Sequence, residues 1–370
     1  MERNYPQDVE QYRKARNKKT LIRRLVVLAV LLAFSVAIAL GSDLISDLYG
    51  LVGTKFPLSF SGERLQKFVH TKNSFIAVCE QQYIIFDDSG ERIAAAPHGF
   101  ANPQISFDGT WAALYEPSGS NITLIENKKE ILQKSFTDKV IFADVSQSGT
   151  FGAITTDRRY LSAFSAYDKG GKEKFRYSSA DQLTSVKFAP DGKRAVLAAL
   201  RSDGGILQTV VTGINFNKEE PKFTFNVENS VCLGIYKTAN AWGLLCDNKI
   251  LFFDDNGKIL SEYALAEKPI SWAASDSGVI AVAVWDQGAY KIVTYSKDKV
   301  TESSAVSDEP KAIAVSGDVA YAVSDHDAYE FDKSGKEKRR VALTTQVSGI
   351  VAVKGSLFAI NDYQVSQIKF

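Results

Sequence analysis

The sequence has few of the residues that form covalent cross-links and metal centres. Its 370 residues include three cysteines, three histidines and one methionine. Cys79, Cys232 and Cys246 are odd in number and show no C-x-x-C spacing, which argues against a disulfide framework and against a zinc site. Cys232 and Cys246 would lie nearly opposite each other if a hairpin turns around residues 237–240. We expect two small buried side chains there, with a disulfide as the alternative.

The histidines give no sign of a metal site. His70, His98 and His326 lie far apart in the sequence, and none has a second histidine or a carboxylate at metal-ligand spacing. His98, within PHGFANP, is expected to be a loop residue with satisfied hydrogen bonds. His326, between Asp325 and Asp327, is expected at the end of a strand, near solvated carboxylates.

Linear motifs of the common enzyme classes are also missing. The chain contains no G-x-S-x-G, G-x-x-x-x-G-K-[ST], G-x-G-x-x-G or H-E-x-x-H. Two pairs of adjacent acids, Asp87–Asp88 and Asp254–Asp255, could suggest calcium, but they begin hairpin turns, where an aspartate caps the turn through its own side chain. We therefore predict no catalytic residue, no cofactor and no metal ligand. A site assembled from distant loops would leave no such motif.

Positive charge is concentrated at the N-terminus. Residues 1–24 hold eight basic and three acidic residues, whereas the net charge of the whole chain is +1, so the remainder is mildly acidic. An acidic body lacks the electrostatic footprint of a nucleic-acid-binding protein. We therefore expect no nucleic acid among the partners.

A single long apolar run follows this basic segment. Leu25–Leu40 reads LVVLAVLLAFSVAIAL, and a helix over these residues would cover about 24 Å of a hydrocarbon core of roughly 30 Å before its flanks are added. Because the basic residues precede the run, the positive-inside rule favours a cytoplasmic N-terminus and an extracytoplasmic body. We predict a tail over residues 1–24, an uncleaved signal anchor that spans the cell membrane once over residues 25–42, and a linker over residues 43–54. A cleaved signal peptide is the alternative.

Residues 55–370 repeat two kinds of turn at a period of about 40 residues. One kind contains Asp-Gly or Ser-Gly pairs, as in ISFDGTWAALY (105–115), and the other reads D-x-x-G, as in LFFDDNGKIL (251–260). Such pairs suit tight hairpins, and their flanks alternate apolar and polar residues as half-buried strands do. Two hairpins in each unit give four antiparallel strands, the blade of a β-propeller. Trp272 and Trp285 fall in the strand pattern and are expected in the core of a blade.

The number of blades follows from the spacing of the turns. Seven units carry both turns, and residues 348–370 add three strands without a fourth. The segment Lys55–Ser59 reads as a strand and could complete this last blade, which would close the ring and remove its exposed sheet edges. Eight blades would average about 39.5 residues, close to the internal period, whereas seven would need about 45. We predict an all-β propeller of eight four-stranded blades, with seven as the alternative.

The order of these features resembles an uncharacterised family of single-pass, membrane-anchored propeller proteins from gram-positive bacteria. The resemblance rests on the tail and anchor and on four segments: FPLSFSG (56–62), YIIFDDSGER (83–92), HGFANP (98–103) and PISWAASDSG (269–278). These are turn and strand residues, so the resemblance implies a fold and assigns no catalytic or binding residue. More loosely, the chain resembles WD40-like and outer-membrane assembly scaffold propellers, although the WD dipeptide is absent.

Together these features favour a non-enzymatic interaction module. A rigid ring held outside the cell membrane would present its loops to a protein of the cell envelope. The alternative is an enzyme or a small-ligand sensor with a site at the mouth of the central channel. A polar, charge-rich channel mouth would favour that alternative.

Overall fold

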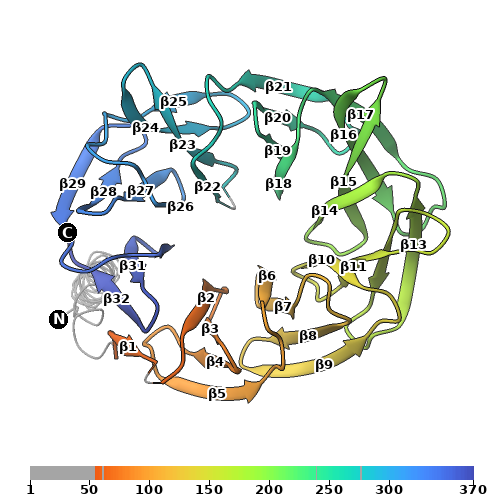
Figure 1. Ribbon diagram of the computed structural model, residues 1–370, viewed down its shortest axis with the longest axis horizontal. Coiled ribbons are helices and arrows are strands. Elements are labelled where there is room, and N and C mark those ends of the chain that lie inside the picture. Colours follow the sequence, from red (N-terminus) through yellow and green to blue (C-terminus); the bar gives the residue numbers. More distant parts are fainter. Residues whose placement is uncertain (1–54, 61, 239, 276) are drawn as a thin grey trace, which may run out of the picture. The chain divides into compact units, whose positions relative to one another are not determined.

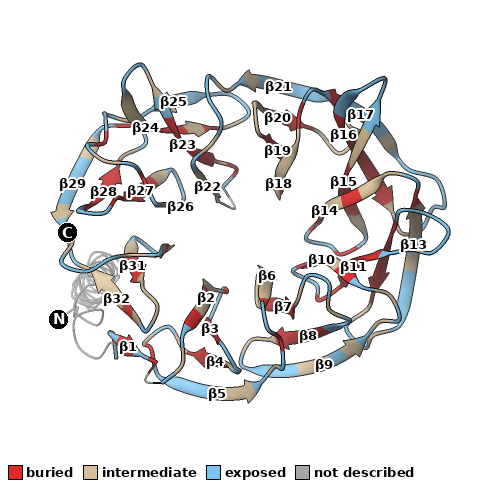
Figure 2. Ribbon diagram, viewed as in Figure 1, coloured by how far each residue is buried: buried red, intermediate tan, exposed pale blue. Residues whose placement is uncertain are grey.

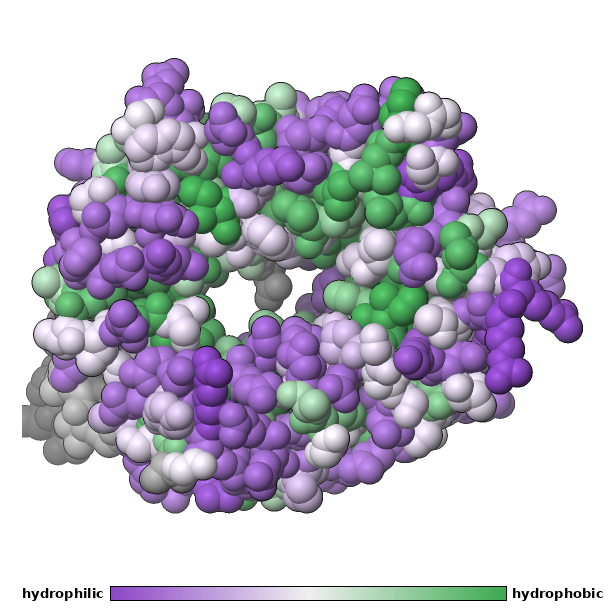
Figure 3. All heavy atoms as spheres, viewed as in Figure 1, coloured by the Kyte–Doolittle hydropathy of each residue, from purple (hydrophilic) through white to green (hydrophobic). Residues whose placement is uncertain are grey.

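The computed structural model describes residues 55–370, except residues 61, 239 and 276. Within these residues, 32 strands form eight sheets of four antiparallel strands each, arranged as a ring (Figure 1). The eight-bladed propeller is therefore confirmed, and the seven-bladed alternative is wrong. An open channel runs through the middle of the ring (Figure 3).

Seven blades consist of consecutive strands, named A to D from the channel outward. Blades 1 to 4 comprise β2 (Leu65–His70), β3 (Phe75–Cys79), β4 (Gln82–Phe86), β5 (Arg92–Pro97); β6 (Gln104–Asp108), β7 (Trp111–Tyr115), β8 (Asn121–Glu126), β9 (Lys129–Ser135); β10 (Val140–Val145), β11 (Phe151–Thr156), β12 (Ser162–Tyr167), β13 (Glu173–Ser179); and β14 (Gln182–Phe188), β15 (Arg194–Asp203), β16 (Ile206–Asn215), β17 (Phe223–Glu228). Blades 5 to 7 comprise β18 (Cys232–Lys237), β19 (Trp242–Cys246), β20 (Lys249–Phe253), β21 (Ile259–Ala264); β22 (Ser271–Ala274), β23 (Ile280–Asp286), β24 (Ala289–Tyr295), β25 (Val300–Glu302); and β26 (Ala312–Ser316), β27 (Val319–Val323), β28 (Asp327–Phe331), β29 (Glu337–Ala342).

Blade 8 is built from both ends of the described chain. Its strands A to C are β30 (Gly349–Val353), β31 (Ser356–Ile360) and β32 (Gln364–Ile368), and strand D is β1 (Leu58–Ser59). Leu58 lies opposite Val365 and Ser59 lies opposite Gln364. The segment that was expected to supply the missing strand therefore does so, although only two of its residues are in the ladder. The edge of β32 is therefore paired, and each of the eight blades has four strands.

The alternating strand directions divide the turns between two ends of the ring. All A–B and C–D turns lie at one end, which we call the A–B face. All B–C turns and the D–A links between blades lie at the other end, which we call the B–C face. Lys55 enters at the A–B face, where its amide donates to the carbonyl of Ser89 in the C–D turn of blade 1.

The core lies between neighbouring blades. For example, Trp111 and Ala113 of blade 2 share one apolar cluster with Val145 and Phe151 of blade 3. The B strands are consequently covered on both faces and buried along their length, as in β7, whereas the D strands alternate between exposed and partly buried residues, as in β21 (Figure 2). The half-buried alternation expected for every strand is therefore correct for the outer strands and wrong for the B strands, because both faces of a middle strand meet another sheet.

The D-x-x-G turns have one repeated structure. In each, the Oδ1 atom of the first aspartate accepts hydrogen bonds from the backbone amides two and four residues later, at 2.8 to 3.2 Å. The aspartates are Asp87, Asp168, Asp254 and Asp332. Asp87 and Asp254 therefore cap turns, as the sequence indicated.

The predicted tail, membrane anchor and linker, residues 1–24, 25–42 and 43–54, lie outside the described residues. Among the residues that the structure does describe, no helix is long and apolar enough to cross a bilayer.

Candidate functional site

The two faces of the ring differ in the side chains that they expose. Thirteen large apolar side chains are exposed in the described part of the chain. Seven of them lie at the B–C face: Tyr160, Leu161, Ile206, Leu207, Ile270, Trp285 and Tyr363. Four others lie on outer D strands, Trp272 lies on an innermost strand, and Phe107 lies at the A–B end of β6. Exposed apolar surface is therefore concentrated on the B–C face.

The B–C turn of blade 3 combines apolar and basic side chains. Tyr160 and Leu161 are 51% and 58% exposed, and they follow two exposed arginines, Arg158 and Arg159. Asp157 closes the turn by accepting the amides of Arg159 and Tyr160 at 2.9 and 3.2 Å. These amides, together with an ion pair to a further arginine of blade 3, hold the pKa of Asp157 below its usual range. Asp157 pairs with Arg176, and within the described residues neither Arg158 nor Arg159 forms an ion pair.

The adjacent B–C turn, in blade 4, lies at the end of a long hairpin. Strands β15 and β16 have ten residues each, and they are joined by Gly204 and Gly205, both of which have positive φ. Ile206 and Leu207 lie exposed beside this tip. Two neighbouring blades thus each carry an exposed apolar pair on the same face.

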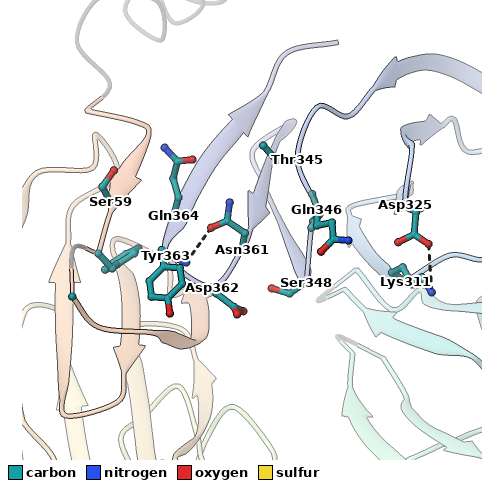
Figure 4. Close-up of a pocket in the computed structure, with 13 residues that line it drawn as sticks. Ser59, Lys311, Asp325, Thr345, Gln346, Ser348, Asn361, Asp362, Tyr363 and Gln364 are labelled. Carbon is teal, nitrogen blue, oxygen red and sulfur yellow. Dashed lines mark hydrogen bonds and ion pairs between the residues drawn. The ribbon is translucent and has the colours of Figure 1, made fainter.

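A hollow lies on the same face, over blades 7 and 8 (Figure 4). It has a volume of about 1160 Å³ and is lined mainly by polar side chains from the closure strand and the loops around β30 to β32. Lys311 forms an ion pair with Asp325 at 3.7 Å on one side, and Tyr363 lies on the other. This hollow adds polar groups to the apolar tips of the B–C face.

The A–B face carries a second hollow, of about 740 Å³, at the turns of blades 1 to 5. Its lining residues are mostly charged or polar: His70, Thr71, Lys72, Phe107, Asp108, Gly109, Gln147, Lys187, Pro190, Asp191, Arg194, Lys237, Thr238 and Asp255. A charge-rich channel mouth is the feature expected if the chain has a ligand site. We call this hollow the A–B mouth.

The second acid of each adjacent pair links two blades at this face. Asp88 accepts His70 Nε2 of its own blade and Lys354 Nζ of blade 8, both at 3.0 Å. Asp255 accepts Trp242 Nε1 of its own blade at 2.8 Å and Arg194 of blade 4 at 2.6 Å. Burial opposes ionisation of both carboxyls, but these bonds outweigh it and hold the pKa of each below its usual range. The links to Lys354 and Arg194 could not be predicted, because these partners lie 266 and 61 residues away in the sequence.

A buried acid near the mouth, Asp144, also has partners within the protein. Asp144, at the end of β10, accepts the amide of Phe188 at 3.0 Å and Lys187 Nζ at 3.2 Å. Its side chain is only 4% exposed. Asp144 therefore joins the A strands of blades 3 and 4.

His98 and His326 lie where the sequence predicts them. The ring of His98 accepts the amide of Phe100 on Nδ1 and donates from Nε2 to the carbonyl of Cys79, both at 2.9 Å, so both nitrogens are satisfied within its loop region. His326 precedes β28 and its exposed ring contacts Asp308 at 3.0 Å. His70 is largely buried, and burial lowers its pKa despite the bond to Asp88. No group of three or more histidine, cysteine, aspartate or glutamate residues suited to a metal occurs in the described ring.

The two facing cysteines lie where the sequence predicts them, whereas two tryptophans do not. Cys232 lies directly opposite Cys246 in the β18–β19 ladder, as expected, and both are free thiols. The core position expected for Trp272 and Trp285 is wrong, since they are 40% and 45% exposed. Trp272 lies on the innermost strand of its blade, and Trp285 lies at the B–C end of β23, where it packs on Tyr290. Period-two patterning gives the face of a strand but not its place within the blade.

The chain belongs to the family of unknown function DUF5711, whose model matches residues 58–370. No curated protein matches the sequence. Among solved structures, Sqt1 from Saccharomyces cerevisiae has a TM-score of 0.61 at 12% identity, covering 84% of this chain and 98% of Sqt1. BamB from Moraxella catarrhalis has a TM-score of 0.58 at 12% identity, covering 85% of this chain and 96% of BamB.

An enzyme is also similar. The dihydro-heme d1 dehydrogenase NirN, solved in complex with DHE, has a TM-score of 0.57 at 12% identity, covering 77% of this chain and 67% of NirN. At these identities the similarity establishes the propeller fold alone.

Proposed function

We propose that this DUF5711 propeller is a non-catalytic interaction module, held outside the cell membrane by its N-terminal anchor, and that its B–C face binds a protein of the cell envelope. The extracytoplasmic position rests on the basic residues that precede the apolar run Leu25–Leu40. The solved structures of similar fold do not distinguish a binding protein from an enzyme, since a dehydrogenase is among them. The argument for binding therefore rests on the surface of this chain.

The observation that carries the proposal is the asymmetry between the two faces. Seven of the thirteen exposed large apolar side chains lie at the B–C face, and they include Tyr160, Trp285 and Tyr363. Aromatic side chains are enriched where proteins meet, because they bury a large apolar area at a small entropic cost. Turns of this kind are free to present such residues, since the ladder hydrogen bonds of the blades do not depend on them.

The basic side chains of the same face indicate the chemistry of the partner. The guanidinium groups of Arg158 and Arg159 are exposed and form no ion pair within the described residues, whereas Arg176 and Arg201 are each paired with an aspartate. An arginine fork is suited to carboxylates. The partner surface is therefore expected to present an apolar patch flanked by acidic residues.

Cross-linking in cells tests the proposal. A photoreactive residue replaces Tyr160 in one variant and Ile259, which is similarly exposed on an outer strand, in the control. We expect the first variant to form a discrete cross-linked product with one envelope protein and the control to form none. The double substitution Leu161→Ser and Ile206→Ser, made in the presence of the Tyr160 cross-linker, should reduce that product at least fivefold.

Two results would contradict the proposal. Equal products from the Tyr160 and Ile259 positions would mean that the B–C face has no preferred role. A product that persists unchanged in the double-serine variant would mean that the apolar tips do not contribute to the contact. If the Tyr160 cross-linking variant and the double-serine variant melt at the same temperature as the unaltered protein, the ring itself is intact in both.

A further inference from the structure

The A–B mouth contains a lysine with a buried side chain whose ammonium group has only long contacts within the described residues. The side chain of Lys237 is 8% exposed, and its Nζ atom donates one long hydrogen bond, of 3.4 Å, to the carbonyl of Ala241. Its ion pair with Oδ1 of Asp255 is also long, at 3.7 Å, and the ring of Trp242 is centred 5.0 Å away. An ammonium group has three donors, and leaving them unpaired in a buried place is costly.

The neighbouring carboxylate does not complete this environment. Asp255 Oδ1 already accepts the indole N–H of Trp242 at 2.8 Å, and its Oδ2 accepts Arg194 at 2.6 Å. Two cations, Lys237 and Arg194, thus converge on one occupied carboxylate. The remaining contact of Arg194, to Asp191, is long at 3.5 Å.

The other carboxylates in and near the mouth have partners within the protein, among them Asp108, which lies 3.9 Å from Lys187 Nζ. Asp144 is filled by the Phe188 amide and Lys187, and Asp191 accepts the amide of Lys193 at 3.0 Å. Lys72 lies on the rim, exposed, and its side chain forms no ion pair within the described residues. The acids of the mouth are engaged with protein donors, while ammonium donors remain available to a ligand.

We propose that the A–B mouth binds a small organic anion, and that its carboxylate or phosphate oxygens are received by Lys237 and Arg194. The volume of about 740 Å³ is in the range of small-molecule sites. Phe107, 42% exposed on the same lining, offers an apolar wall to the non-ionic part of such a ligand. The site lies on the opposite face from the proposed protein contact, so either proposal can fail without the other.

Binding of two defined probes to the full-length protein in detergent tests the inference. Citrate serves as the carboxylate probe and pyrophosphate as the phosphate probe, and calorimetric titration gives the affinity of each. We expect at least one probe to bind, and the variant Lys237→Met to weaken it at least tenfold. The control Lys311→Met, made in the hollow of the opposite face, should bind as the unaltered protein does.

Comparing the unaltered protein with the Lys237→Met variant also distinguishes binding at the mouth from binding elsewhere on the chain. The basic tail could attract anions, but such binding would be equal in the Lys237→Met variant, and that result would overturn the proposal. Absence of binding by both probes would overturn it as well. If Lys237→Met fails to fold, Lys72→Met and Phe107→Ser carry the test: each is expected to weaken binding two- to fivefold, and no change in either would count against the site. Preference for one probe would identify the ligand as a carboxylate or a phosphate.

Discussion

At the scale of the residue, the glycine of the D-x-x-G turn allows two blades to approach each other closely, a role that the motif alone does not indicate. In all four turns this glycine has positive φ and its Cα lies against strand D of the preceding blade. A Cβ atom added at Gly257 would lie 2.6 Å from the side chain of Phe223, and one added at Gly171 would lie 3.0 Å from Leu132. The glycine therefore allows both the turn and the close approach of two blades.

Comparing the variant Gly257→Ala with Gly205→Ala separates these two roles of the glycine. Both glycines have positive φ, but a Cβ atom at Gly205 would meet nothing within 4 Å. We expect Gly205→Ala to lower the free energy of unfolding by about 1–2 kcal/mol through backbone strain alone. Gly257→Ala should cost a further ~1–3 kcal/mol, because the added methyl group overpacks the contact with Phe223. Urea unfolding measures both, and equal losses would show that the contact between blades tolerates a methyl group.

At the scale of the element, the ring depends on a strand of two residues. Leu58 is buried against Val365 and the core of blades 8 and 1, and Phe56 packs its ring on Phe358 at 4.6 Å between centroids. Short as β1 is, it covers the edge of β32 that would otherwise be open. The apolar side chains around it, more than its ladder bonds, must hold it in place.

The variant Leu58→Ala is expected to loosen this closure. Removing a buried leucine side chain costs about 2–5 kcal/mol, and the loss should appear first at the junction of the two chain ends. Hydrogen exchange should quicken in β32 while the B strands of blades 3 to 5 remain protected. Ser59→Ala, at the exposed neighbouring position, is the control and should leave exchange unchanged. Uniform acceleration throughout the ring would instead indicate that the blades unfold as one unit.

The elements that could be predicted from the sequence are those formed by local interactions. The hairpin turns are local, so the capping role of Asp87 and the count of eight blades could be inferred from spacing. The roles of Asp88 and Asp255 could not, because their partners Lys354 and Arg194 belong to preceding blades, 266 and 61 residues away in the chain. The exposed Trp272 was mistaken for a core residue, because the pattern does not distinguish an innermost strand from a middle one.

At the scale of the whole molecule, the low reactivity expected of the three cysteines allows the predicted membrane orientation to be tested by labelling. Cys79 and Cys246 are fully buried, and burial raises the pKa of Cys79 and of Cys232 to about 12. Since the thiolate is the reactive form, these groups should react slowly with maleimides near neutral pH. A cysteine added at an exposed position would then report its own compartment.

Lys218→Cys and Lys14→Cys form a matched pair for this purpose. Lys218 is exposed in the C–D turn of blade 4, and Lys14 belongs to the predicted cytoplasmic tail. With a membrane-impermeant maleimide on intact cells, we expect labelling of Lys218→Cys at least tenfold above that of the unaltered protein, and none of Lys14→Cys until the cells are lysed. The reverse pattern would place the propeller in the cytoplasm and remove envelope proteins as its partners, while the anion site, which depends only on the ring, would be unaffected.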